Sequence, residues 1–274
     1  MTPPPSVHFV LGPALLFCPA DRPDRFDKAL QRADAVIVDL EDAVPPGLRA
    51  AARAAVLDHP LDPERTIVRI NGFDTPDFAA DLEMLHATRY RYVMLAKAES
   101  TVDYEALADY TVIALCETAA GVVDAGRIAA AGPVGALMWG AEDLVASMGG
   151  TSSRGPDGGY RPVIAQARAS VAFAAAAQGV AMIDAVHLDI TDHDGLSAEA
   201  ADAAALGFVA TACIHPSQVD VIRQAYRPRD SELSWARGVL AAAAGGGVTV
   251  YEGRMVDEPI LRHARAVLRR AAPS

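Results

Sequence analysis

The sequence is poor in cysteine and lysine, and it has no long apolar run and no run of basic residues. Its three cysteines, Cys18, Cys116 and Cys213, lie far apart, and each falls within an apolar stretch. A disulfide framework or a zinc site would show close, paired cysteine spacings. We therefore expect buried, reduced thiols and a reducing compartment, which is the cytoplasm by default.

Acidic residues outnumber basic ones, and the formal net charge is -11. Nucleic acids and anionic membranes require a basic face, so we expect neither as a partner and predict a small ligand instead. No apolar stretch approaches the roughly 20 residues that cross a bilayer. The proline-rich start, Met1 to Ser6, has no positively charged region of the kind that opens a signal peptide.

What the sequence does have is a regular alternation of short apolar runs and alanine-rich stretches with helical spacing. The predicted strands are Leu15 to Ala20, Ala35 to Leu40, Thr66 to Ile70, Tyr92 to Ala96, Val112 to Cys116, Ala136 to Trp139, Met182 to Leu188 and Ala210 to Ile214. Predicted helices include Arg49 to Leu57, Phe78 to His86, Val122 to Ala130, Arg161 to Gln178 and Ser197 to Leu206.

Eight apolar strands alternating with helices are typical of an α/β chain that closes into a (β/α)8 TIM barrel. We predict this barrel over residues 1–228, followed by a C-terminal extension or lid over residues 229–274. An open sheet with a dinucleotide site should show Gly-x-Gly-x-x-Gly after its first strand, but Asp21-Arg22-Pro23-Asp24 stands there. The glycine-rich stretch Gly149 to Gly159 lacks the ending of a phosphate loop, and we predict a mobile loop.

Polar residues follow six of the predicted strands, and in a TIM barrel these positions form the active-site face. They are Asp39-Leu40-Glu41-Asp42, Arg69-Ile70-Asn71, Lys97, Glu117-Thr118, Gly140-Ala141-Glu142-Asp143 and His215-Pro216. Glu117 and Asp143 end neighbouring strands, so their carboxylates can converge and hold Mg²⁺, which accepts one or two protein carboxylates. The alternative is that each carboxylate caps the helix after its strand.

Three further strand-end residues have two interpretations each. Arg69 could hold a substrate carboxylate in its planar fork, or pair with Asp39, Glu41 or Asp42. Lys97 could form a Schiff base, but nearby carboxylates favour its charged form, so we expect an ion pair. His215 could act as a base or make local hydrogen bonds.

Six motifs in this order resemble the citrate lyase beta subunit family of the HpcH/HpaI aldolase superfamily, whose relatives cleave malyl-CoA and citramalyl-CoA. They are Leu16-Phe17-x-Pro19-Ala20, Asp39-Leu40-Glu41-Asp42, Ile67-Val68-Arg69-Ile70-Asn71, Glu117-Thr118-x-x-Gly121, Gly140-Ala141-Glu142-Asp143 and Gly253-Arg254-Met255-Val256-Asp257-x-Pro259. The resemblance spans the chain from Leu15 to about Ala266.

The resemblance implies a barrel in which Glu117 and Asp143 hold Mg²⁺. It implies that Arg69 binds the carboxylate of a keto acid such as oxaloacetate, which the backbone around Ala141, Glu142 and Asp143 helps to orient. By the same resemblance, Glu41 and Asp42 surround the waters of the metal.

The tail reads as a flexible hinge at Gly245-Gly246-Gly247, a hairpin from Val248 to Val256, and a helix from Pro259. The resemblance implies that Asp257 is the catalytic acid/base and reaches the active site of a neighbouring subunit. That arrangement requires a homo-oligomer, commonly a trimer. The alternative role of Asp257 is the N-cap of the last helix.

The resemblance thus implies a Mg²⁺-dependent carbon–carbon lyase that splits a 3-hydroxyacyl thioester into a keto acid and an acyl thioester. One alternative is a citrate lyase beta subunit working with alpha and gamma subunits, and another is a non-catalytic subunit that binds a keto acid or acyl-CoA. Many family members have paired basic residues before the first strand, where this chain has Leu11-Gly12-Pro13-Ala14. Arg22, Arg25 and Lys28 could instead meet CoA phosphates, or form a solvated helix face.

Overall fold

The computed structural model describes residues 9, 11–245 and 249–271 of the 274-residue chain. It divides into two compact units, Met1–Ile222 and Arg223–Ser274, and the division falls within helix α9 (Gln218–Tyr226).

The first unit contains a closed barrel of eight parallel strands, each paired with its neighbours in sequence order and β8 paired with β1. This confirms the predicted TIM barrel. The strands are β1 (Ala14–Pro19), β2 (Ala35–Asp39), β3 (Thr66–Ile70), β4 (Tyr92–Leu95), β5 (Thr111–Cys116), β6 (Val134–Trp139), β7 (Ala181–Asp184) and β8 (Ala210–Cys213).

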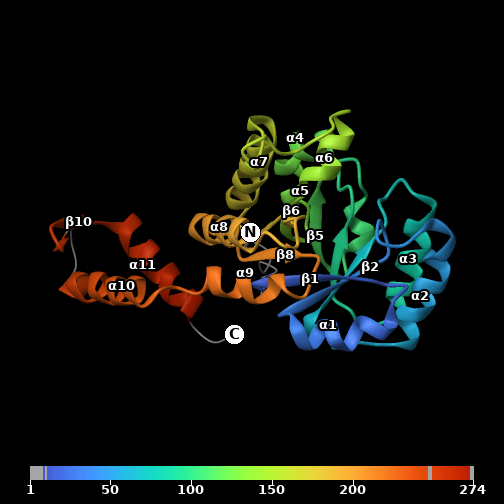
Figure 1. Ribbon diagram of the computed structural model, residues 1–274, viewed down its shortest axis with the longest axis horizontal. Coiled ribbons are helices and arrows are strands. Elements are labelled where there is room, and N and C mark those ends of the chain that lie inside the picture. Colours follow the sequence, from blue (N-terminus) through green and yellow to red (C-terminus); the bar gives the residue numbers. More distant parts are fainter. Residues whose placement is uncertain (1–8, 10, 246–248, 272–274) are drawn as a thin grey trace. The chain divides into compact units, whose positions relative to one another are not determined.

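Helices surround these strands, as α1, α2, α3 and α7 show in Figure 1. The α-helices of this unit before α9 are α1 (Phe26–Arg32), α2 (Arg49–Asp58), α3 (Pro76–His86), α4 (Ala119–Val123), α5 (Ala125–Ala129), α6 (Ala141–Ser147), α7 (Pro162–Gln178) and α8 (His193–Leu206). The short 3-10 helices are η1 (Pro23–Arg25), η2 (Pro46–Leu48), η3 (Pro63–Arg65) and η4 (Tyr104–Leu107).

The barrel interior is filled by apolar side chains that alternate along each strand with side chains facing the helices. The interior cluster includes Leu15, Ile37, Ile67, Met94, Ile113, Leu115, Met138 and Ile183. Because side chains of a strand alternate between its two faces, a residue two positions after a member of this cluster also faces the barrel interior.

Three local predictions differ from the structure. Strand β7 ends at Asp184 rather than at Leu188. The Ala185 N–H donates to the Asp184 carboxylate at 3.1 Å and so is not available for pairing with a neighbouring strand. The helix predicted from Val122 to Ala130 is two short helices, interrupted at Asp124. Helix α8 begins before Ser197, because the Asp192 side chain caps it through the Gly195 N–H.

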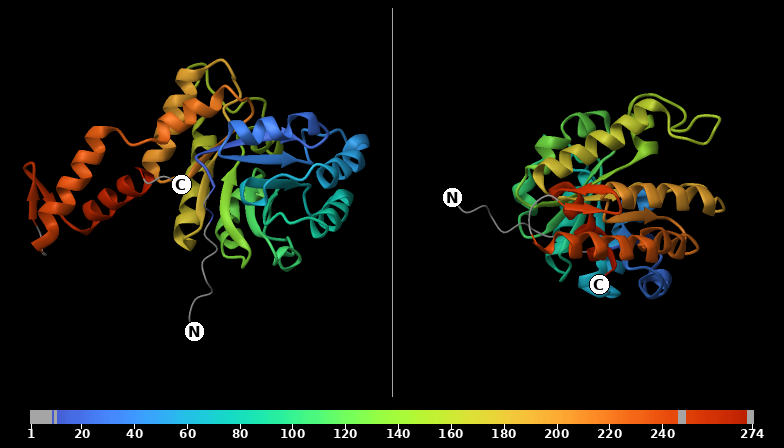
Figure 2. Two further views of the ribbon diagram at one scale, coloured as in Figure 1. Left: turned by 90° about the horizontal axis from the view of Figure 1, so that it is seen from below. Right: turned by 90° about the vertical axis from the view of Figure 1, so that its left-hand side faces the viewer.

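The second unit consists of α10 (Asp230–Ala242), the 3-10 helix η5 (Ala243–Gly245), the hairpin β9 (Thr249–Tyr251) with β10 (Arg254–Val256), and α11 (Glu258–Ala271). The two helices pack against each other, as the orange and red segments of Figure 2 show. Their shared core is Ala236, Val239, Val256, Ala264 and Val267. The predicted hairpin and final helix are therefore present, while Gly246, Gly247 and Val248 of the predicted hinge and hairpin lie outside the described residues.

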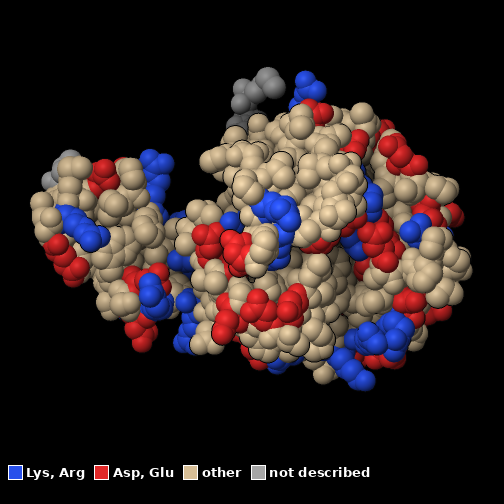
Figure 3. All heavy atoms as spheres, turned by 45° about the horizontal axis from the view of Figure 1, so that its top comes forward, with Lys and Arg blue, Asp and Glu red and all other residues tan. Residues whose placement is uncertain are grey.

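The surface carries both signs of charge. On the face drawn in Figure 3, basic side chains lie among acidic ones rather than forming one broad basic area. Cys18, Cys116 and Cys213 are buried thiols, as predicted. Within the part of the chain that the structure describes, no helix is both long and apolar enough to cross a bilayer.

Candidate active site

The inward-facing positions at the carboxyl ends of the strands are polar. Asp39, Arg69 and Glu117 each lie two residues after an interior apolar side chain, namely Ile37, Ile67 and Leu115. The two-residue period therefore directs all three side chains into the mouth of the barrel. All three are buried, with exposed fractions of 1%, 8% and 2%.

A cavity of about 340 Å³ opens at this mouth. Its lining comes from seven of the strand ends and the loops that follow them, and it contains both predicted metal ligands. The lining residues are Phe17, Asp39, Asp42, Ala43, Arg69, Leu115, Glu117, Met138, Trp139, Gly140, Ala141, Glu142, Asp143, Val186, Leu188 and Ile214.

Glu117 is fixed from two sides. The backbone N–H of Lys97 donates to Glu117 Oε1 at 3.0 Å. Gly140 leaves room for the carboxylate, since a Cβ there would lie only 2.9 Å from Glu117 Oε2. Burial, reinforced by the nearby negative charge of Asp143, raises the pKa of Glu117 to about 8 from an ordinary value of 4.5.

The two carboxylates fit a hard divalent cation better than they fit helix capping. Thr118 caps α4 through the Gly121 N–H, and α6 has Gly140 at its N-cap, so neither carboxylate is at a capping position. Among the described residues, no group of three or more His, Cys, Asp or Glu side chains could hold a metal ion. A site with two carboxylates suits Mg²⁺, which fills its other positions with water and substrate oxygens.

Arg69 combines two of its predicted roles. Its Nε and Nη2 donate to the two oxygens of Asp39 at 2.7 and 2.6 Å, while Nη1 lies 3.2 Å from Glu41 Oε2. Its guanidinium lies over the Phe17 ring, 5.0 Å from the centroid. Burial alone would lower the pKa of Arg69, but the bond to Asp39 raises it, so the group stays charged beside the cavity.

Lys97 is ion-paired, as expected. Its Nζ contacts Glu41 and lies 3.4 Å from Asp42 Oδ2 and 3.7 Å from Asp143 Oδ1. Although burial opposes the charge, the carboxylates of Glu41, Glu117 and Asp42 raise the pKa of Lys97 above its ordinary value. A protonated amine is not a nucleophile, so the Schiff-base alternative has no support in this geometry.

The remaining predicted residues lie in different surroundings. His215 is exposed and makes a local hydrogen bond to Ser217 Oγ at 2.8 Å, as expected for its structural role. Three predicted cations are exposed around the start of α1, and Arg22, which precedes η1, pairs with Asp24 at 3.1 Å. They are Arg22, Arg25 and Lys28.

Two acidic residues complete the predicted set. Glu142 lines the cavity and accepts a hydrogen bond from Ser153 Oγ at 2.5 Å. Asp257 belongs to the second unit, where its carboxylate accepts from the Ile260 N–H at 3.3 Å, which is the N-cap arrangement for α11. Asp257 therefore has the predicted N-cap role, and its acid/base role stays a prediction.

Sequence reasoning assigned no site role to Phe17 and treated Asp39 only as a partner of Arg69. The signal that could have placed Asp39 inward is its spacing of two residues from Ile37. Trp139 was also missed, although it borders the cavity and immediately precedes the Gly140–Asp143 turn.

Comparison with known proteins gives consistent findings. The model of the HpcH/HpaI aldolase/citrate lyase family matches residues 14–216. The chain is 57% identical over 261 residues to a citrate lyase subunit beta-like protein of Mycobacterium tuberculosis (strain H37Rv), covering 95% of this chain and 96% of the relative. It is 34% identical over 297 residues to an L-malyl-CoA/beta-methylmalyl-CoA lyase of Rhodobacter capsulatus, covering 93% of each.

Among solved structures, the chain is similar to protein CitE from Mycobacterium tuberculosis in complex with magnesium, acetoacetate and coenzyme A. The TM-score is 0.91 at 56% identity, and the match covers 95% of this chain and 98% of that one. The similarity therefore extends over both units of the chain.

Proposed function

This chain is a carbon–carbon lyase of the HpcH/HpaI aldolase/citrate lyase family, and we propose that it cleaves a 3-hydroxyacyl-CoA thioester with Mg²⁺ as cofactor. The substrate carries a carboxylate on the carbon that bears the hydroxyl, as in malyl-, citramalyl- or citryl-CoA. Cleavage of the bond between that carbon and the thioester α-carbon yields a keto acid, such as glyoxylate, pyruvate or oxaloacetate, and an acyl-CoA.

Glu117 and Asp143 would hold the metal, because both carboxylates line the cavity and the charge of one raises the pKa of the other. When bound, Mg²⁺ supplies positive charge that makes the substrate hydroxyl easier to deprotonate and stabilises charge on the keto-acid oxygen. Glu41 and Asp42 would hydrogen-bond waters next to the metal, and Lys97 holds these two carboxylates in place.

Arg69 would bind the substrate carboxylate. Asp39 occupies its Nε and Nη2 and so fixes the plane of the guanidinium, while Nη1 faces Glu41 near the cavity. Backbone N–H groups of Ala141, Glu142 and Asp143, at the start of α6, are the remaining donors for orienting the keto acid. Positioning of this kind lowers the entropic part of the barrier before any bond breaks.

Cleavage requires two proton movements. The hydroxyl loses its proton, the carbon–carbon bond breaks with its electron pair going to the thioester α-carbon, and the resulting enolate takes a proton from an acid. We assign that acid to Asp257, supplied by a neighbouring subunit of a homo-oligomer, with a trimer favoured. In the condensing direction the same carboxylate would remove the proton.

Thioester recognition is proposed for the exposed cations Arg22, Arg25 and Lys28, which can meet CoA phosphates at the rim of the barrel. A second candidate is a citrate lyase beta subunit that works with alpha and gamma subunits on a carrier-bound citryl thioester, which the name of the Mycobacterium tuberculosis relative favours. The three buried thiols fit a reducing compartment, for which we propose the cytoplasm.

The observation that carries the proposal is a buried carboxylate of raised pKa, Glu117, beside Asp143 and Arg69 at one cavity. The test is a screen of malyl-, citramalyl- and citryl-CoA with and without Mg²⁺, following release of acetyl-CoA. We expect turnover only with the metal, and we expect Glu117→Gln to abolish it.

The matched control is Glu83→Gln, an exposed position on α3, which should keep wild-type turnover. Cleavage by the metal-stripped Glu117→Gln protein at the wild-type rate would refute the proposal. A protein that binds Mg²⁺ and a keto acid but cleaves none of these thioesters would instead indicate a non-catalytic binding subunit.

A further inference from the structure

Asp184 is a buried carboxylate that the proposed reaction does not use. It ends β7 and is 5% exposed. The preceding residue, Ile183, faces the barrel interior, so Asp184 faces the layer between strands and helices. Asp184 is not among the residues that line the active-site cavity, and it cannot itself contact the substrate there.

Four hydrogen bonds converge on this one carboxylate. The indole Nε1 of Trp139 donates to Oδ1 at 2.6 Å, and the Ala185 N–H donates to the same oxygen at 3.1 Å. Arg168 donates from Nε to Oδ1 at 3.0 Å and from Nη2 to Oδ2 at 2.8 Å. A carboxylate with this number of donors has one fixed orientation.

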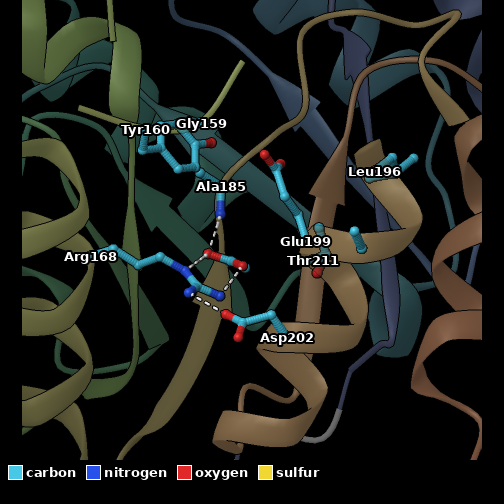
Figure 4. A pocket seen from close by; sticks show the side chains of 10 residues that line it. Gly159, Tyr160, Arg168, Ala185, Leu196, Glu199, Asp202 and Thr211 are labelled. Atoms are coloured by element: carbon cyan, nitrogen blue, oxygen red, sulfur yellow. Dashed lines mark hydrogen bonds and ion pairs between the residues drawn. The ribbon is translucent and has the colours of Figure 1, made fainter. Parts of the chain in front are cut away.

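Arg168 is held in turn from the opposite side. Its Nη1 donates to Asp202 Oδ2 on α8 at 2.7 Å, and its guanidinium lies 4.8 Å from the centroid of the Phe208 ring. Figure 4 shows Arg168 reaching from α7 toward Asp202 on α8, across a pocket bordered by Tyr160 and Glu199. The carboxylate of Asp184 is thus tied to two helices as well as to its own strand.

Trp139 connects this cluster to the active site. It is the last residue of β6, is 1% exposed, and borders the catalytic cavity. The next residues are Gly140, which makes room for Glu117, and the first turn of α6, which carries Asp143. Strands β6 and β7 are paired in parallel with Met138 opposite Ile183, which brings Trp139 beside Asp184.

The indole has one N–H donor, and Asp184 accepts it. The Tyr160 and Trp139 rings make a T-shaped contact at a centroid distance of 5.2 Å, but a ring contact is less directional than a hydrogen bond. The Asp184 carboxylate is therefore the directional partner of the Trp139 side chain at the end of β6.

We propose that Asp184 is a positioning residue of the active site, which anchors Trp139 through its indole N–H and thereby fixes the turn that presents Asp143 to the metal. The inference rests on the proposed function for its reaction, but its first readout is metal binding. Arg168 contributes by holding the Asp184 carboxylate, and Asp202 holds only the outer edge of Arg168.

The test compares Asp184→Asn with Asp202→Asn. Asp202→Asn is the matched control, because it makes the same chemical change at a carboxylate that contacts the same arginine. The Asp202 side chain is 57% exposed, so its ion pair with Arg168 contributes little to stability. Mg²⁺ affinity is measured by calorimetry, and keto-acid affinity and turnover are measured alongside it. We expect Asp184→Asn to lose about tenfold or more in Mg²⁺ affinity, the loss typical for a group that orients a metal ligand.

Asp202→Asn should keep the wild-type Mg²⁺ affinity. Equal losses in the two variants would mean that the cluster only stabilises the fold, and wild-type affinity in a folded Asp184→Asn protein would overturn the proposal outright.

Tryptophan emission reports directly on the surroundings of the Trp139 indole, so it tests the anchoring separately from the stability of the fold. The chain has two tryptophans, so Trp235→Phe leaves Trp139 as the single emitter. In this background Asp184→Asn should change the emission maximum of Trp139 and increase its quenching by acrylamide, whereas Asp202→Asn should change neither. Unchanged emission in a folded Asp184→Asn protein would contradict the anchoring of Trp139.

Asp184→Asn weakens the anchor by removing the negative charge that accepts from Trp139 and Arg168, whereas Trp139→Phe removes the indole donor altogether and decides the question if Asp184→Asn does not fold. A wild-type Mg²⁺ affinity in Trp139→Phe would overturn the proposal. If both variants fold, Asp184→Asn should cost much less Mg²⁺ affinity in the Trp139→Phe background than in the wild type, because the two residues act through one bond. Additive losses would contradict that coupling.

The proposed function can fail separately. A wild-type protein that binds Mg²⁺ but cleaves no thioester refutes the lyase reaction and leaves the affinity and emission comparisons intact. A wild-type Mg²⁺ affinity in both Trp139→Phe and Asp184→Asn refutes the anchor and leaves the reaction intact.

Discussion

At the scale of single residues, the site depends on the environment of Glu117. Water is excluded from this carboxylate and Asp143 lies nearby, so the metal-free protein holds a proton that an exposed glutamate would release. The positive charges of Arg69 and Lys97 oppose this rise in the pKa of Glu117 without cancelling it, and the Lys97 Nζ contacts Glu41 while its backbone N–H reaches Glu117. A bound cation is then the group that makes the ionised form of Glu117 favourable.

This environment predicts a pH-dependent Mg²⁺ affinity. A pKa of about 8 means that the metal must displace a proton at lower pH. We expect the apparent affinity to rise by up to about tenfold per pH unit between about pH 6 and 8 and to level off above that range. Calorimetry in buffers of different ionisation enthalpy measures both the affinity and the proton released.

The stability of the metal-free protein gives the control. Between its ordinary pKa of 4.5 and its folded-state pKa of about 8, Glu117 binds more protons in the folded protein than in the unfolded chain. Stability should therefore fall as pH rises through this window, and Glu117→Gln should remove this part of the pH dependence. A Mg²⁺ affinity that stays constant from pH 6 to 8 would contradict the raised pKa.

At the scale of elements, the close packing of α10 against the β9–β10 hairpin positions the segment that leads to Asp257. Tyr251, at the end of β9, lies directly against Gly238 of α10, where a Cβ would overlap the tyrosine hydroxyl and ring. Asp257 immediately follows β10, so a displacement of the hairpin also displaces Asp257. A glycine is thus needed at position 238 because Tyr251 leaves no room for a side chain there, and not because the backbone has a positive φ.

Gly238→Ala should therefore reduce turnover by at least about tenfold, because the added methyl group forces Tyr251 and the hairpin away from α10. Mg²⁺ and keto-acid binding by the barrel should remain at the wild-type level. The measurements are kcat, the Mg²⁺ affinity and the keto-acid affinity of the variant and the wild type.

Gly126→Ala on α5 is the control, since a Cβ there meets no atom within 4 Å. It should leave turnover unchanged. Loss of metal binding together with turnover in Gly238→Ala would point to a general folding defect rather than to a displaced hairpin.

At the scale of the whole molecule, the chain separates its proposed chemistry between two units. Glu117, Asp143 and Arg69 belong to the barrel, and Asp257 belongs to the second unit. If Asp257 serves the barrel of a neighbouring subunit, the active site exists only in the oligomer, and two differently damaged subunits can complete one site.

We expect such complementation from Arg69→Ala and Asp257→Ala. Each variant alone should be inactive, and an equal mixture, reassembled after dissociation, should recover roughly a quarter of the wild-type activity, because random assembly pairs an intact barrel with an intact Asp257 in that fraction of sites. Activity assays before and after mixing measure the effect.

Mixing two preparations of the same variant is the control and should recover nothing. No recovery in a confirmed mixed oligomer would indicate that Asp257 serves its own chain or has no catalytic role beyond capping α11.

The sequence by itself determined the elements of the barrel and the polar residues at their carboxyl ends. Apolar runs separated by helical stretches gave eight strands, and Thr66–Ile70 was predicted with its observed bounds. The reason is local, because the two-residue period of a strand and the turns that end it are written in adjacent residues. The same period also marks Asp39, Arg69 and Glu117 as inward-facing.

Only the tertiary structure decided which of these residues touch. The choice of Asp39 and Glu41 as partners of Arg69, the reach of Lys97 to Glu41, and the bond between Trp139 and Asp184 all join residues distant in sequence. The strand register and the packing of helices over the barrel set these distances, and neither is encoded within a single segment. Asp184 shows the consequence most clearly, because in the sequence it is one polar residue within a strand predicted from Met182 to Leu188, and only the closed barrel places it beside Trp139.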